Sequence, residues 1–207
     1  MTARPEILLI ACGALAREIA ALKRANAWSA LELRCLPAEL HNRPERIAPA
    51  VRAEIRANRE RYAQIFVVYG DCGTGGELDR VLREEGVERL AGAHCYEFLA
   101  TRPVFAALAD TEPGTFYLTD FLLRHFERLV VRSLALDRHP ELRGEYFRNY
   151  KKLVYLAQTE IPGARERAQK IADSFGFSFE YRFTGYGDLG TRLEQLVTSQ
   201  ASLACRA

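Results

Sequence analysis

The sequence has no long apolar run. None of its hydrophobic stretches approaches the ~20 residues that a membrane-spanning helix requires, so no membrane partner is expected. Residues 1–6 lead directly into the apolar run Ile7–Ile10, which is too short and too soon followed by charge for a signal peptide. These two absences predict a soluble protein of the cytoplasm, where cysteines stay reduced.

An excess of charge of either sign is also missing. The 29 Lys and Arg residues nearly balance the 27 Asp and Glu residues, and the formal net charge is +2. Nucleic-acid-binding proteins usually concentrate basic residues on one face. The nearest candidate, Arg52–Arg61, also contains Glu54 and Glu60 and has the apolar spacing of an amphipathic helix with a solvated face. No nucleic-acid partner is therefore expected.

Repeats, low-complexity segments and convincing linkers are absent as well. The chain of 207 residues is 48% hydrophobic and 27% charged, a composition that is typical of ordinary globular proteins. We therefore expect a single α/β domain that spans residues 1–207.

Along most of the chain, a short apolar or alternating run is followed by a turn and by a stretch with helical periodicity. The expected strands are Ile7–Ala11, Leu31–Cys35, Gln64–Tyr69, Glu88–Gly92, Lys152–Leu156 and Ser178–Phe183. The expected helices are Ala14–Lys23, Ala50–Arg61, Glu77–Glu85, Leu118–Leu136, Pro140–Tyr150, Pro162–Phe175 and Leu189–Thr198. This alternation predicts an α/β fold with a mainly parallel sheet and helices on both faces, similar to a Rossmann fold.

The five cysteines include no Cys-x-x-Cys pair, but four of them follow a pattern. Each lies at or just after the end of an expected strand: Cys12, Cys35, Cys72 and Cys95. Ligands of parallel sheets sit beyond the carboxyl ends of the strands, so we expect Cys12, Cys72 and Cys95 to gather at one edge of the sheet. Cys35 and Cys205 are instead expected to be small buried hydrophobic residues.

Two histidines come from the same loops as these thiols. His41 follows the second expected strand, and His94 directly precedes Cys95. Thiolate and imidazole groups are the ligands that zinc prefers, and three or four of them suffice. The pattern therefore predicts a metal site, with zinc as the expected ion, formed by Cys12, Cys72 and Cys95 and completed by His41 or His94. A non-catalytic carrier of a metal ion or an iron–sulfur cluster is an alternative.

The loop Gly70–Gly76 allows a different site. Its glycines let backbone amides approach a ligand, and the following helix offers its positive end to an anion. The loop partly matches the Asp-x-Gly-x-Gly motif of S-adenosylmethionine-dependent methyltransferases, although Glu77 stands where a third spaced glycine is expected. This alternative assigns cofactor binding to Gly73, Thr74, Gly75 and Gly76. A plain tight turn between strand and helix explains the same residues.

Three polar side chains are candidates for catalytic roles at this edge: Asp71, Glu97 and Tyr186. Glu97 follows a pair of expected metal ligands and would support them or carry a proton; an acidic residue in the first turn of a helix is the alternative interpretation. Tyr186 lies in the last strand-to-helix loop and would contact a substrate. Thr119 or Asp120 is expected to cap a helix.

Several stretches of the sequence resemble the DUF1638 domain family, whose activity is not established. They are Ala11–Leu15, Cys35–Pro44, Tyr69–Gly76, His94–Phe98, Phe116–Leu129, Tyr150–Thr159 and Thr184–Gly187, so the resemblance covers nearly the whole chain. Similar proteins occur beside corrinoid-dependent methyl-transfer systems, which implies one-carbon metabolism with a small-molecule substrate and a corrinoid protein as partner.

The chain lacks the Asp-x-His-x-x-Gly signature of a corrinoid-binding domain. The resemblance therefore implies a partner or a methyl-handling component of such a system rather than the corrinoid carrier. The leading hypothesis is a zinc-binding protein that acts as a metal-dependent methyltransferase or as an accessory component of methyl transfer.

Overall fold

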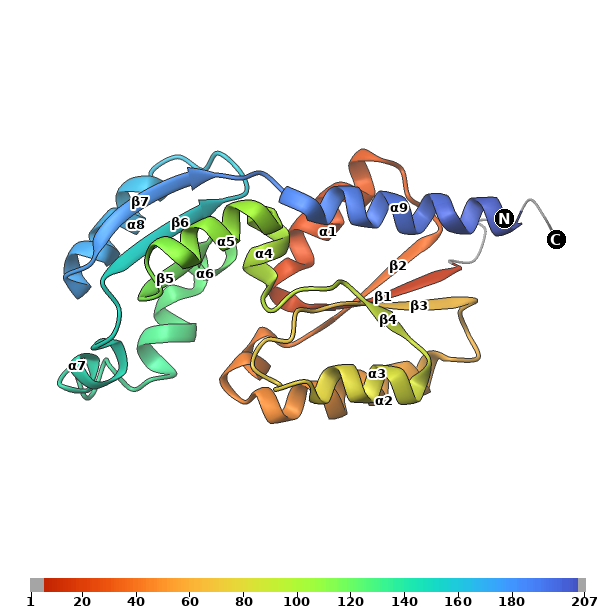
Figure 1. Ribbon diagram of the computed structural model, residues 1–207, viewed down its shortest axis with the longest axis horizontal. Helices are drawn as coiled ribbons and strands as arrows, with labels where there is room; N and C mark the ends of the chain where they lie inside the picture. The colour runs from red at the N-terminus through yellow and green to blue at the C-terminus, as the bar shows by residue number, and fades with distance from the viewer. Residues whose placement is uncertain (1–5, 205–207) are drawn as a thin grey trace. The chain divides into compact units, whose positions relative to one another are not determined.

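The computed structural model describes residues 6–204 and, for the last helix, side chains through residue 199. The chain divides into two compact units (Figure 1). The first unit comprises residues up to Cys95 together with the segment from Asp188 onward, and the second unit is Tyr96–Gly187. Each unit has its own sheet, and the single domain expected for residues 1–207 stays a prediction.

The first unit contains a four-stranded parallel sheet with the strand order β2-β1-β3-β4. Its strands are β1 (Ile7–Cys12), β2 (Leu31–Leu36), β3 (Gln64–Val68) and β4 (Glu88–Arg89). Its helices are η1 (Gly13–Leu15), α1 (Ala16–Ala25), η2 (Ala38–Asn42), η3 (Pro44–Arg46), α2 (Ile47–Asn58), α3 (Glu77–Glu85) and most of α9 (Gly187–Ala204).

Helices cover both faces of this sheet (Figure 1), with α2 and α3 on one face and α1 and α9 on the other. The central strand β1 is buried along its whole length, because a strand covered on both faces needs apolar side chains at every position. Leu8 and Ile10 pack in one core cluster with Ile47, Val51 and other residues of α2 and α3. The strand pleat sends the intervening residues to the opposite face.

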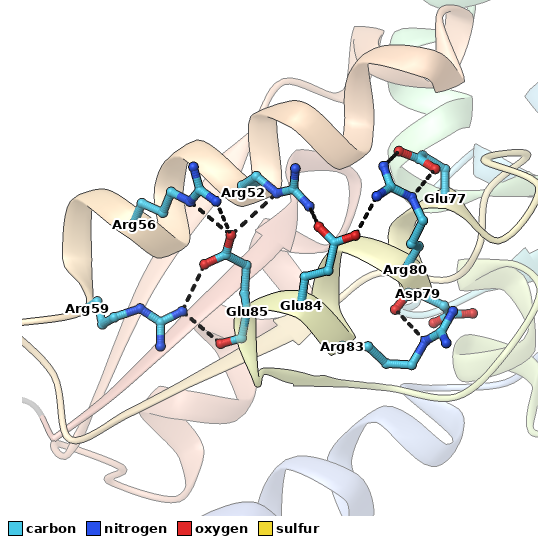
Figure 2. Close-up of polar contacts among 9 residues, drawn as sticks. All are labelled: Arg52, Arg56, Arg59, Glu77, Asp79, Arg80, Arg83, Glu84 and Glu85. Atoms are coloured by element: carbon cyan, nitrogen blue, oxygen red, sulfur yellow. Dashed lines mark hydrogen bonds and ion pairs between the residues drawn. The ribbon is translucent and has the colours of Figure 1, made fainter.

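Helices α2 and α3 are joined by a network of ion pairs (Figure 2). Glu85 accepts hydrogen bonds from Arg56 Nε at 2.8 Å and Arg59 Nη2 at 3.0 Å, and Arg52 Nε lies 3.4 Å from the same carboxylate. Arg52 also pairs with Glu84. The basic stretch that begins at Arg52 is therefore largely part of the amphipathic helix α2, and its Arg52, Arg56 and Arg59 pair with carboxylates of α3.

Replacing Glu85 by alanine is expected to lower the thermal unfolding midpoint more than Glu84→Ala does. Both carboxylates form ion pairs, but the Glu85 side chain is 8% exposed and that of Glu84 is 45% exposed. Solvent screens exposed pairs, so their contribution to stability is small. Removing Glu85 also leaves three arginines without their shared partner. Thermal unfolding of the two variants side by side tests this order, and equal midpoints would contradict it.

The stabilisation provided by Glu85 is also expected to depend on pH. The hydrogen bond from Arg56, helped by that from Arg59, lowers the pKa of Glu85 in the folded protein below its ordinary value of about 4.3. The stabilisation is therefore fully present above that ordinary value and is lost as the pH falls through the lower folded-state pKa. The difference between wild type and Glu85→Ala should shrink as the solution is acidified.

The second unit contains a three-stranded parallel sheet with the order β5-β6-β7. Its strands are β5 (Thr115–Thr119), β6 (Lys152–Ala157) and β7 (Ser178–Phe183). Its helices are α4 (Cys95–Ala100, from Tyr96 onward), α5 (Arg102–Thr111), α6 (Asp120–Phe126), the π-helical segment η4 (Glu127–Arg132), α7 (Leu142–Phe147) and α8 (Ala164–Phe175).

Both faces of the second sheet are also covered. Leu153 and Tyr155 pack in a core cluster with residues of α6 and α8. Val154 and Leu156 point to the opposite face and pack with Leu108 of α5. The predicted α/β fold with parallel pairing and helices on both faces is therefore confirmed, and among the described residues no helix is long and apolar enough to cross a membrane.

The main difference from the expectation concerns β5, which was expected to be partly helical. The apolar run from Leu118 onward has helical periodicity, but the strand continues to Thr119 and the helix begins only at Asp120. Thr119 is the N-cap, as predicted, and its Oγ1 accepts a hydrogen bond from the Leu122 amide at 3.2 Å. Together with β5, the strands form two parallel sheets rather than one. The periodicity of each segment predicts a strand but does not tell which strands share a sheet.

Candidate metal site

The carboxyl ends of the first three strands lie level with one another. In the sheet register Cys12 is opposite Leu36, and Ala11 is opposite Val68. The three loops that follow these strands therefore start at one edge of the first sheet. Gly13 packs so closely on the loop after β2 that a Cβ atom there would lie 2.9 Å from the Leu36 carbonyl oxygen.

The loops after β3 and β4 are joined by backbone hydrogen bonds. The amide of Asp71 donates to the Gly92 carbonyl at 3.0 Å, and the amide of Cys72 donates to the Ala93 carbonyl at 2.9 Å. A Cβ atom at Gly70 would lie 2.8–2.9 Å from the backbone of His94, so this position requires glycine. The pairing brings Cys72 and Cys95 together although they are far apart in sequence.

Cys12, Cys72 and Cys95 of the first unit lie close enough for their charges to interact, and we call them the thiol cluster. Cys12 is 1% exposed, Cys72 is 7% exposed, and Cys95 is partly buried. Burial raises the pKa of Cys12 to about 12 and that of Cys72 to about 11, and it raises the pKa of Cys95 well above its ordinary value. Cys72 is close enough to both other thiols to raise their pKa values further.

The expectation for Cys35 was wrong, because this residue is exposed rather than buried. It lies on β2, which is the edge strand of the first sheet. An edge strand has a neighbour on one side only, so its side chains are less fully covered than those of β1. Cys205, which was also expected to be buried, lies outside the described residues.

His41 has the geometry of a neutral histidine with one free lone pair. Its Nδ1 lies 3.1 Å from the Ala38 carbonyl oxygen and 3.7 Å from Cys12 Sγ. A carbonyl oxygen only accepts hydrogen bonds, so Nδ1 carries the proton and Nε2 carries the lone pair. Burial lowers the pKa of His41, with the nearby His94 adding to the effect, and Nε2 is buried without a hydrogen-bond partner among the described residues.

Two residues that sequence analysis did not assign to the site also border the thiol cluster. Tyr69 is fully buried, its ring stacks on that of His41 with centroids 6.2 Å apart, and its hydroxyl lies beside Cys12. Glu18 of α1 is 5% exposed, and its charge raises the pKa of Cys95. The sequence contains a signal for each of them: Glu18 is a carboxylate among the apolar positions of a helix, and Tyr69 follows the carboxyl end of a buried strand.

Asp71 organises the glycine-rich loop. Its carboxylate accepts hydrogen bonds from Thr74 Oγ1 at 2.6 Å, from the Gly76 amide at 2.9 Å and from the Gly75 amide at 3.2 Å. Burial would raise its pKa, but these hydrogen bonds outweigh burial and hold the pKa below its ordinary value. Gly73, Gly75 and Gly76 all adopt positive φ. The loop residues therefore have a structural role, while cofactor binding by them stays a prediction.

The other two candidate catalytic residues belong to the second unit. Glu97 of α4 accepts a hydrogen bond from Arg102 Nε at 2.7 Å, and its side chain is 13% exposed. Tyr186 lies in the turn before α9 and is partly buried. Their predicted roles beside a metal ion stay predictions.

Within residues 6–204, no group of three or more His, Cys, Asp or Glu side chains is set to hold a metal ion as it stands. The three thiols are near enough for their charges to interact, but they do not form a ligand set in this structure. Of the two predicted imidazole ligands, His41 is partly buried against Cys12, whereas His94 is exposed. The structure thus brings the predicted residues together without showing an ion-binding geometry.

Residues 35–193 match a family model described as a protein of unknown function, DUF1638. The matched region includes Cys35, His41, Cys72 and Cys95, whereas Cys12 lies before it. No curated protein and no solved structure matches the chain.

Proposed function

The chain belongs to the DUF1638 family, and from the thiol cluster we propose that it is a metal-binding protein with zinc as its ion. The observation that carries this proposal is the proximity of three thiols to the partly buried His41, whose Nδ1 lies 3.7 Å from Cys12 Sγ and whose Nε2 is buried without a hydrogen-bond partner among the described residues. A buried polar atom without a partner is unfavourable. A metal ion would use the lone pair of this Nε2.

The proposed ligands are Cys12, Cys72, Cys95 and His41. Three thiolates and one imidazole are a common zinc ligand set, and a borderline-soft ion suits it. The hydrogen bond from His41 Nδ1 to the Ala38 carbonyl supports ligation through Nε2, because metal-bound histidines usually donate their other ring proton to such an acceptor. His94 is the weaker candidate for the imidazole ligand because it is exposed.

Burial of protonated thiols also fits a role in metal binding. A coordinated thiol loses its proton, and the ion compensates the negative charge that burial otherwise opposes. Glu18 and Tyr69 border the same cluster and would contact the ligands rather than the ion. With only three of the four proposed side chains bound, the fourth position of a tetrahedral ion would be open, and a thiol substrate bound there would be activated as a thiolate for methyl transfer.

A role in one-carbon metabolism is the finer part of the proposal and depends on the resemblance to proteins that accompany corrinoid-dependent systems. In this role the protein would bind a small-molecule substrate, and a corrinoid protein would be its partner. The alternative of S-adenosylmethionine binding at Gly73–Gly76 has less support, because Asp71 already uses the amides of Gly75 and Gly76.

Metal analysis of protein purified without oxygen tests the proposal. We expect about one zinc ion per chain, since one ligand set of this kind binds a single ion. A visible absorption band with bound iron and sulfide would instead indicate the iron–sulfur carrier. Negligible metal after anaerobic purification, together with no uptake of added zinc or iron, would contradict metal binding altogether.

A further inference from the structure

Two adjoining cavities lie at the carboxyl edge of the second sheet. The larger has a volume of about 440 Å³ and is lined by Tyr155, Tyr181 and Arg165, among others. The smaller, of about 130 Å³, is lined by Arg124 and Arg167, among others. The loop from β6 to α8 contributes residues to both. Their combined size suits a small molecule.

Three arginines surround these cavities, and none of them has a carboxylate partner within the described part of the chain. Arg124, Arg165 and Arg167 form no salt bridge there, and the guanidinium of Arg165 lies 5.3 Å over the ring of Tyr181. This contrasts with the arginines of α2, which pair with Glu84 and Glu85. Uncompensated guanidinium groups at a cavity favour an anionic ligand.

The exposed Glu160 lines the larger cavity, and one carboxylate, that of Asp120, borders the smaller cavity. It is 3% exposed and already accepts four hydrogen bonds, from the Tyr155 hydroxyl, the Gln158 amide, and the amide and hydroxyl of Thr159. These donors stabilise its charge from within the protein, so the arginines remain available to a ligand.

Helix α8 begins at the same place. Gly163 is its N-cap residue, has φ of +72°, and supplies no side chain that would cap the first amides. A Cβ atom at Gly163 would meet no other atom within 4 Å. The positive end of a 12-residue helix therefore opens on the smaller cavity beside Arg124 and Arg167.

We propose that these cavities bind a small molecule that carries a phosphate group. Arg124, Arg167 and the first turn of α8 hold the phosphate in the smaller cavity. An aromatic or apolar part of the ligand lies in the larger cavity against Tyr155 and Tyr181, with Arg165 at its entrance. The site consists of residues of the second unit alone, so it does not depend on metal binding by the thiol cluster.

Calorimetry with phenyl phosphate, inorganic phosphate and benzoate tests this site. Phenyl phosphate is expected to bind at least about tenfold more tightly than either of the others, because it alone combines a phosphate group with an aromatic ring. Its affinity should fall as the salt concentration rises. No binding of phenyl phosphate, or equal affinity for inorganic phosphate or benzoate, would overturn the proposed ligand class.

Variants locate the binding. Arg124→Gln and Arg167→Gln should each weaken phenyl phosphate binding about tenfold, the loss of one charge-assisted hydrogen bond. Arg138→Gln, a change at an exposed arginine that lines neither cavity, should leave affinity unchanged. Circular dichroism of each variant verifies folding. Arg167 is exposed, so the Arg167→Gln variant is expected to fold. Unchanged affinity in folded Arg167→Gln and Arg124→Gln would overturn the assignment.

Discussion

Cys72→Ser is expected to weaken zinc binding far more than Cys35→Ser does. Cys72 is buried beside Cys12 and Cys95, whereas Cys35 is exposed on the edge strand. Loss of a residue that only supports a ligand weakens metal binding by roughly 10–100-fold, so loss of a direct ligand should exceed that range. Competition with a zinc chelator measures both affinities.

Cys35→Ser is a matched control, because the substitution is the same and the residue lies at the same end of the first sheet. Cys12→Ser and Cys95→Ser should behave like Cys72→Ser. If Cys35→Ser lost as much affinity as Cys72→Ser, or if none of the four substitutions changed it, the assignment of the thiol cluster as ligands would be wrong.

The pH dependence of zinc affinity follows from the same residues. The pKa values of Cys12 and Cys72 are raised to about 12 and about 11 by burial, so both thiols are protonated at neutral pH. Zinc must displace one proton from each thiol that it binds, and affinity therefore rises by about tenfold per pH unit for each such thiol. Removing one thiol ligand should reduce this slope, whereas Cys35→Ser should not.

Asp120→Ala is expected to have the largest effect on stability. The buried carboxylate joins the end of β5 to the end of β6 by accepting hydrogen bonds at 2.6–3.2 Å from Tyr155, Gln158 and Thr159. Alanine would leave the buried donors of Tyr155 and Gln158 without an acceptor, which we expect to lower the free energy of unfolding by about 3–5 kcal/mol. Denaturant unfolding monitored by circular dichroism measures this loss.

Asp110→Ala is the control for this prediction. Asp110 is an exposed residue of α5 in the same unit, and surface substitutions of this kind change stability by no more than about 0.5 kcal/mol. A loss for Asp120→Ala that is no greater than that of Asp110→Ala would show that the hydrogen bonds of Asp120 do not stabilise the second unit.

The sequence predicted the parts of the fold that depend on local periodicity. Strands β1 and β3 were recognisable because a strand covered on both faces is apolar at nearly every position. Asp120 was expected only to cap a helix. Asp120 also accepts hydrogen bonds from the loop after β6. That loop lies 38 residues away in the sequence, so no local pattern predicts the contact.

The candidate metal site could be predicted in part. Parallel pairing alone implied that Cys12, Cys72 and Cys95 would converge, because residues that follow parallel strands meet at one edge. The exposure of Cys35 could not be read from the sequence, since it depends on which strand is at the edge of the sheet. The unpartnered Nε2 of His41 likewise depends on the course of the loop after β2, which no periodic pattern determines.

The most direct test of the proposed metal site is the absorption spectrum of the protein after anaerobic replacement of zinc by cobalt(II). The thiol cluster predicts an intense thiolate-to-cobalt charge-transfer band, which weakens in Cys12→Ser, Cys72→Ser and Cys95→Ser and is unchanged in Cys35→Ser. A cobalt-loaded protein without that band, or with a band that all three cluster variants retain in full, would contradict metal binding by these thiols.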